Sequence, residues 1–118
     1  MGFVERRTDT VTVTANSKLG GANASILTDL DAQSAGALVV QVETNADGNK
    51  LDVRALGRFT PGGTQTPIEG TRAALDVSSG GAIRRYDVDG LPRTTIEIAN
   101  GAAVDGALTI NLGTVEGR

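Results

Sequence analysis

The stretch "GAIRRYDVDGLPRTTIEIANGAA", residues 81–103, holds two runs in which apolar and polar side chains alternate. The apolar row of the first run includes Tyr86 and Val88, and that of the second includes Ile96 and Ile98. Alternation with a period of two is the pattern of a strand with one buried face. Between the runs, "DGLP" supplies a glycine that tolerates positive φ and a proline that fixes φ. The stretch therefore predicts two β-strands joined by a hairpin or a corner.

The same alternation recurs along most of the chain. It is present in "TVTVTA" (10–15), "ALVVQVET" (37–44), "KLDVRA" (50–55), "ALDVSS" (74–79) and "ALTINLG" (107–113). Short strands bounded by Gly, Asn, Asp or Pro at such spacings are typical of β-sandwiches and barrels. The segment "ASILTDLDAQSAG" (24–36) fits either one strand face or one helical turn. We expect a strand there, because the flanking Gly, Asn and Ser residues leave no room for a helix of ordinary length.

Two positions carry turn or bulge signals. The pair Asp47-Gly48 is a strong hairpin signal, which predicts that strands at 37–44 and 50–56 are joined by a tight turn. Gly57 follows a break in the alternation and predicts a β-bulge.

Length and composition fit a single thin sandwich. A chain of 118 residues is the size of one domain, and its apolar residues, 39% of the total, include only two Phe and one Tyr as aromatics. An aliphatic core of this kind suits two sheets packed about 10 Å apart. We predict an all-β fold, an antiparallel β-sandwich that is jelly-roll-like and has about eight strands. Residues 1–8 are expected as an N-terminal arm, and residues 9–118 as a single sandwich domain.

The residue inventory argues against an enzyme. His and Cys are both absent, so thiolate and imidazole catalysis are impossible and zinc, copper or haem would lack their usual ligands. No nucleophile elbow or phosphate-binding glycine loop is present. We therefore expect no catalytic residue, no metal and no cofactor.

Charge and hydropathy limit the partners. The net charge is −3, and the 14 acidic and 11 basic residues are scattered, which argues against a nucleic-acid partner. No apolar run is long enough for a signal peptide or a bilayer span, so we expect no membrane partner and synthesis in the cytoplasm.

The acids of the opening stretch, Asp87 and Asp89, are interpreted as turn-flanking residues that pair with nearby arginines. A calcium site at these residues, or within "NADGN" (45–49), is a weaker alternative. Neither segment has the bidentate Glu at the spacing that an EF-hand requires.

Two segments carry apolar residues that favour docking on another protein. The arm has Phe3 and Val4 beside two arginines, and these apolar residues are expected to dock on the domain itself or on a neighbour, with a disordered terminus as the alternative. The long segment 59–72 has Phe59 and Ile68 as anchors, and the prolines Pro61 and Pro67 between them stiffen it. The turn at 89–93 is a third contact candidate. The predicted interface residues are Phe3, Val4, Arg6, Arg7, Phe59, Pro61, Pro67, Ile68 and Arg93.

The pattern "GAIRRYDVDGLPRTTIEIANGAAVDGALTINLG", preceded by "ALVVQVETNADGNKLDVRALGRF", resembles small β-sandwich proteins of tailed viruses, including capsid decoration proteins. The resemblance covers residues 9–113 and lies in a "Y-x-V-x-G-L" step into a strand such as "TTIEIAN", followed by a closing strand such as "ALTINLG". It implies a non-enzymatic virion component that sits on a shell or tail as a homo-oligomer, with a major capsid or tail protein as its partner. The family has no catalytic residues to transfer to this chain.

A carbohydrate-binding module is the alternative function, because small β-sandwiches are common lectin scaffolds. The absence of Trp and the inward position predicted for Tyr86 count against it. A polar site built from Asp, Asn and Arg side chains stays open.

Overall fold

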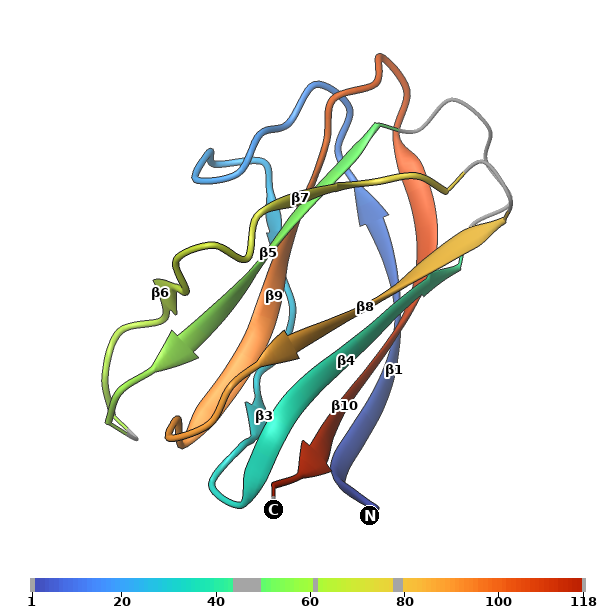
Figure 1. Cartoon of the computed structure of the whole chain (residues 1–118). Coiled ribbons are helices and arrows are strands. Elements are labelled where there is room, and N and C mark those ends of the chain that lie inside the picture. Colours follow the sequence, from blue (N-terminus) through green and yellow to red (C-terminus); the bar gives the residue numbers. More distant parts are fainter. Residues whose placement is uncertain (1, 44–49, 61, 78–79, 118) are drawn as a thin grey trace.

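The computed structural model describes residues 2–43, 50–60, 62–77 and 80–117, and every regular element within them is a β-strand. The strands form two antiparallel sheets that face each other around an aliphatic core (Figure 1). The predicted all-β antiparallel sandwich is confirmed.

Sheet A consists of four long strands in the order β1-β10-β4-β8. They are β1 (Phe3–Val13), β10 (Gly106–Glu116), β4 (Ala35–Glu43) and β8 (Gly81–Asp87). The pairing of β1 with β10 brings the first and last strands of the chain side by side, and the two ends of the chain lie close together in Figure 1.

Sheet B has two long central strands and short strands along both edges. Its strands are β2 (Ser25–Ile26), β3 (Leu30–Asp31), β9 (Arg93–Asn100), β5 (Leu51–Arg58), β6 (Thr66–Pro67) and β7 (Ala73–Leu75). Both β2 and β3 pair with β9, and both β6 and β7 pair with β5, so each couple acts as one interrupted edge strand. The result is two four-stranded layers, β1-β10-β4-β8 facing β2/β3-β9-β5-β6/β7, which is jelly-roll-like.

The core lies between the two sheets and is aliphatic, as predicted. The inward rows contain Leu38, Val40, Val42, Leu51, Val53, Ile96, Ile98, Leu108, Ile110 and Leu112, all buried. Tyr86 is the aromatic member of this cluster among the described residues. Removing these aliphatic surfaces from water is the main stabilising contribution to a sandwich of this size.

Both tight connections predicted from sequence lead from one sheet to the other. The predicted hairpin between β4 and β5 is wrong, because β4 pairs within sheet A and β5 within sheet B. The Asp47-Gly48 pair itself lies outside the described residues. Likewise β8 is in sheet A and β9 in sheet B, so "DGLP" makes a corner, with Gly90 at φ 85° and the Leu91 N–H bonded to the Val88 carbonyl at 3.2 Å. A turn signal predicts that the chain reverses. It does not predict in which sheet the next strand lies, because that depends on where the apolar row of the strand is buried.

Gly57 does not form the predicted bulge. Pairing between β5 and β9 runs without a shift from Leu51 opposite Asn100 to Arg58 opposite Arg93. A Cβ on Gly57 would lie 2.6 Å from Leu91 Cδ1, so the missing side chain makes room for the corner residue to pack over β5.

One further segment differs from expectation and another agrees with it. Residues 3–8, expected as an arm, belong to β1 and pair with β10 from Phe3 opposite Val115 onward. The segment 24–36 forms strands, as expected, but they are the short β2 and β3 and the start of β4, in place of one continuous strand.

Candidate docking surfaces

On the outer face of sheet B, the central strand β9 is covered by the chain itself. On β9, the outward Thr95, Glu97 and Ala99 are buried as deeply as the inward isoleucines. The connection between β1 and β3 lies over them. The Leu27 carbonyl accepts a hydrogen bond from the Thr95 hydroxyl at 2.9 Å, and the Gly20 N–H donates one to Glu97 Oε2 at 2.9 Å.

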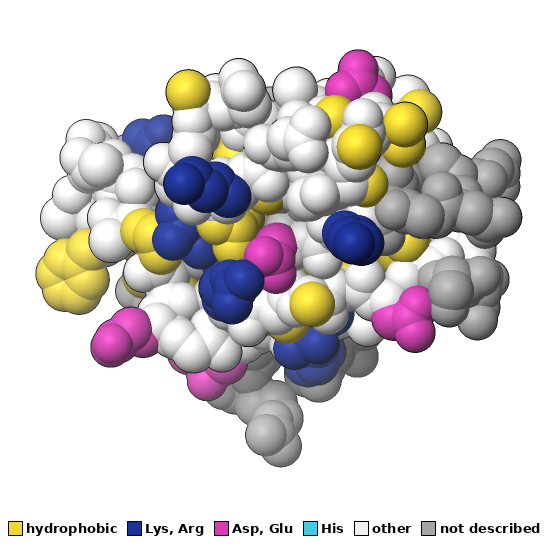
Figure 2. All heavy atoms as spheres, turned by 90° about the horizontal axis from the view of Figure 1, so that it is seen from above, with side chains coloured by type: hydrophobic (Ala, Val, Ile, Leu, Met, Phe, Trp, Pro, Cys, Tyr) yellow, Lys and Arg dark blue, Asp and Glu magenta, His cyan; other side chains and the backbone are white. Residues whose placement is uncertain are grey.

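Glu97 anchors this cover through a charged contact as well. Its Oε1 lies 2.6 Å from Arg54 Nε on the neighbouring strand β5. A second ion pair on the same sheet joins Arg72 Nη2 and Asp52 Oδ2 at 2.7 Å. In the view from above, several Lys and Arg side chains lie around an acidic one (Figure 2).

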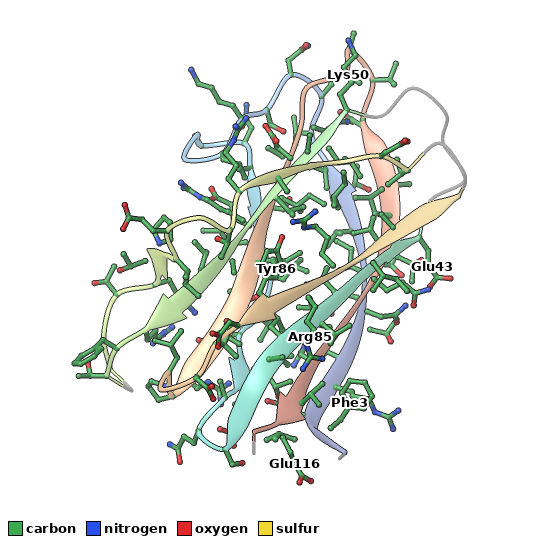
Figure 3. All side chains as sticks on the ribbon, in the orientation of Figure 1. Phe3, Glu43, Lys50, Arg85, Tyr86 and Glu116 are labelled. Carbon is green, nitrogen blue, oxygen red and sulfur yellow. The ribbon has the colours of Figure 1, made fainter. Side chains whose placement is uncertain are left out.

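The outer face of sheet A is open by contrast. Its outward side chains border a hollow of about 390 Å³ and include apolar groups that water reaches: Ile83 is 67% exposed and Phe3 is 50% exposed. We call this surface the sheet A face; it contains Phe3, Arg6, Thr8, Val39, Gln41, Ile83, Arg85 and Asn111. Phe3 and Glu43 point away from the core on this side of the molecule (Figure 3).

Phe3 is held flat against the sheet. Its ring occupies the place that a side chain on Gly113 of β10 would need, so the glycine provides its seat. The Arg6 guanidinium lies 5.2 Å from the ring centroid, a cation–π distance. An aromatic side chain fixed in this way loses little conformational entropy when a partner covers it.

A row of polar side chains crosses three strands of the sheet A face. The Thr8 hydroxyl donates to Asn111 Oδ1 at 2.6 Å. Asn111 Nδ2 in turn donates to Gln41 Oε1 at 3.1 Å and to Glu43 Oε2 at 2.8 Å. The row fixes the orientation of each amide, so the face offers hydrogen-bonding groups in set positions.

The outer side of sheet A carries exposed charges of both signs, because Glu43 of β4 and Asp87 of β8 lie there with two arginines. Arg6 and Arg85 are exposed, and neither has an ion pair with any acid in the part of the chain that the structure describes. Arg7 points to the other side of β1, where its Nη2 lies 3.7 Å from Asp9 Oδ1. Val4 is half-buried and packs against the core.

A second hollow, of about 470 Å³, lies where the segment 59–68 meets the corner between β8 and β9. It brings together three of the predicted interface residues, Phe59, Pro67 and Ile68, with Leu91. We call it the Phe59 hollow. Phe59 is 88% exposed, whereas Ile68 is half-buried against the core. Pro61 lies outside the described residues.

Arg93 has an internal role. Its Nη2 lies 3.1 Å from Asp29 Oδ1, and Arg58 Nε lies 3.1 Å from Asp29 Oδ2. Gln65 Nε2 donates to the same carboxylate at 2.7 Å, which ties the segment 59–68 to sheet B. Sequence patterns did not single out Asp29, because its three partners come from distant parts of the chain.

The acids of the opening stretch behave as turn residues, but within the described residues neither forms the expected ion pair with an arginine. The Asp89 N–H donates to Asp87 Oδ1 at 3.1 Å, an Asx-type turn. Across the described ranges, no group of three or more Asp and Glu side chains is placed to hold a metal ion. Nor does the described chain contain a helix long and apolar enough to cross a membrane.

Tyr86 lies inward, as predicted, near the edge of the core. Burial raises the pKa of its phenol above the ordinary value, and the nearby positive charge of Arg84 partly offsets this shift. The Arg84 guanidinium lies 5.8 Å from the ring centroid. The ring is therefore committed to the core and is not a platform for a sugar.

The sequence matches no family model and no curated protein. Solved structures match over nearly the whole chain. A mitogen from Yersinia pseudotuberculosis superposes with a TM-score of 0.61 at 13% identity, covering 97% of this chain and 88% of that chain. The SPBc2 prophage-derived protein YomS superposes with a TM-score of 0.54 at 12% identity, covering 97% of each chain. At these identities the likeness shows a shared β-sandwich fold.

Proposed function

We propose that this chain is a non-enzymatic structural protein of a tailed-virus particle, a decoration or other accessory protein that docks as a homo-oligomer on a repeating shell or tail surface. The observation that carries the proposal is the asymmetry of the two outer faces. The outer face of β9 in sheet B is covered by its own chain, whereas the sheet A face exposes Ile83 and Phe3 together, beside Arg6 and Arg85. Apolar groups exposed together on one face mark an interaction site.

The chemistry of the sheet A face defines its partner. Ile83 and the seated ring of Phe3 supply apolar area that a partner can bury. Arg6 and Arg85 fit carboxylates, because a guanidinium forms paired, charge-assisted hydrogen bonds with them. The face therefore fits a partly apolar protein surface that offers carboxylates to these two arginines, and in this proposal that surface belongs to the major capsid or tail protein.

The viral part of the proposal has two supports. The sequence resembles small sandwich proteins of tailed viruses, and the fold is similar to that of a prophage-derived protein. Assembly on a particle in the host cytoplasm requires neither a membrane nor nucleic-acid contact, and the proposal includes neither.

The test uses particles made by the genome that encodes this chain. Purified protein is added to particles lacking it, and occupancy is measured by co-sedimentation. Ile83→Asp places a negative charge on the sheet A face and is expected to weaken binding by about 30-fold or more. The control is Val104→Asp, because Val104 is also an exposed apolar residue, 60% accessible, but lies in the loop before β10. Equal occupancy of all three proteins would refute the proposed docking surface.

Glycan binding is the second candidate, favoured by one observation. The row Thr8–Asn111–Gln41 offers fixed hydroxyl and amide groups near the half-exposed ring of Phe3, a combination that suits a sugar. A glycan array with the wild type and Asn111→Ala separates the candidates. Specific binding that Asn111→Ala abolishes, together with unchanged particle occupancy, would favour the lectin role.

A further inference from the structure

Phe59 is the most exposed of the large apolar side chains in the described chain. It follows the last residue of β5, and 88% of its surface is accessible. An isolated exposed apolar residue needs no explanation, but this one lies at the rim of a hollow lined largely by apolar groups. A protruding side chain and a receptor for such a side chain are therefore neighbours.

The hollow is preformed. Its apolar walls are Pro67, Ile68 and Leu91, three threonines complete the lining, and Leu91 packs directly over Gly57. The Ile68 N–H donates to the Ala55 carbonyl at 2.9 Å, which fastens the wall to β5. A rigid receptor costs little ordering entropy on binding.

The lining of the Phe59 hollow is uncharged. None of the described residues around it carries a charge, so a second copy of this chain meets no like-charge repulsion there. The hollow is thus compatible with self-association.

We propose that two copies of this chain associate through the Phe59 hollow, each inserting Phe59 between Ile68 and Leu91 of its partner. Because the inserted ring and its receptor belong to the same patch, a single two-fold contact fills both hollows and closes the assembly. The proposal rests on the homo-oligomer of the proposed function and names its contact. It leaves the sheet A face free for the particle.

The first experiment measures self-association without particles. Light scattering over a concentration series is expected to show a dimer for the wild type and for Val104→Ser, the matched exposed control. Phe59→Ser is expected to weaken the association constant by about 30-fold or more, because a central aromatic anchor is lost from both copies. Circular dichroism and thermal melting verify that both variants are folded. A monomeric wild type at the highest concentration, or an unchanged constant for Phe59→Ser, would overturn the proposal.

The second experiment locates the contact by disulfide cross-linking. Because the chain has no cysteine, an introduced thiol is the only one that can react. Thr64→Cys places a thiol at the edge of the hollow, and Val104→Cys places one on an exposed loop elsewhere. Mild oxidation is expected to cross-link Thr64→Cys copies at least tenfold faster than Val104→Cys copies. Equal rates would contradict this contact, even if a dimer forms.

The two proposals fail separately. Two results together support both proposals: Phe59→Ser abolishes dimerisation, and Ile83→Asp weakens particle binding by the expected factor. Self-association that is insensitive to Phe59→Ser refutes the hollow alone. Particle occupancy insensitive to Ile83→Asp refutes the sheet A face alone.

Discussion

The outward residues of β9 and β10 are similar in sequence but differ in burial. On β9, "TTIEIAN" places Thr95 and Glu97 outward, and on β10, "ALTINLG" places Thr109 and Asn111 outward. The first two are buried under the connection between β1 and β3, whereas the second two are half-buried at a surface open to solvent. Polar outward residues therefore serve internal cohesion on sheet B and remain available to a partner on sheet A. The following predictions test that difference, from the largest expected effect to the smallest.

Removing the carboxylate of Glu97 should have the largest effect on stability. Glu97→Ala leaves the Arg54 guanidinium without its partner and the Gly20 N–H unsatisfied, so we expect a loss of about 3 kcal/mol. Asn111→Ala on the open face should cost less than about 1 kcal/mol. Urea unfolding followed by circular dichroism measures both. Similar losses for the two variants would contradict the difference between the faces.

The same substitution on both strands gives a matched comparison. Thr95→Val removes the hydroxyl that bonds to the Leu27 carbonyl and should cost about 1 kcal/mol. Thr109→Val at a half-exposed position of β10 should change stability by less than about 0.5 kcal/mol. If the two variants unfold with equal m-values, the difference between their urea midpoints gives the difference in stability between the two positions.

Gly113→Ala tests the seat of Phe3. The added methyl group takes the place of the ring, which can swing into solvent, so we expect a change of less than about 1 kcal/mol. The ring signals of Phe3 should move in the NMR spectrum, which is simple because the chain has two Phe and one Tyr. Unmoved signals would show that the ring does not lie against Gly113.

Ile83→Ser should have the smallest effect. Ile83 is well exposed at the edge strand of sheet A, so the free energy of unfolding should stay within about 0.5 kcal/mol of wild type. A clear fall in the thermal midpoint would mean that the sheet A face contributes to the fold, and its role as a free docking surface would be weakened.

Sequence patterns predicted the burial of individual side chains better than they predicted how segments pair. The inward rows and the buried Tyr86 follow from alternation, because successive side chains of a strand point to opposite faces. Phe59, Pro67 and Ile68 of the segment 59–72 lie around one hollow, and their role as contact residues stays a prediction. Asn111, Gln41 and Ile83 were missed, although their signal was the outward half of the same alternation.

Alternation by itself determined that this chain forms a two-layer β-sandwich with an aliphatic core, since each strand must bury one row of side chains. Only the tertiary structure decided the sheet to which each strand belongs, as for β4 and β5, and which outer face is covered. The physical reason is that period-two patterning specifies which side of a strand is buried against the core but not what lies on its other side. That depends on contacts such as Gly20 with Glu97 and Leu27 with Thr95, made between residues far apart in the sequence.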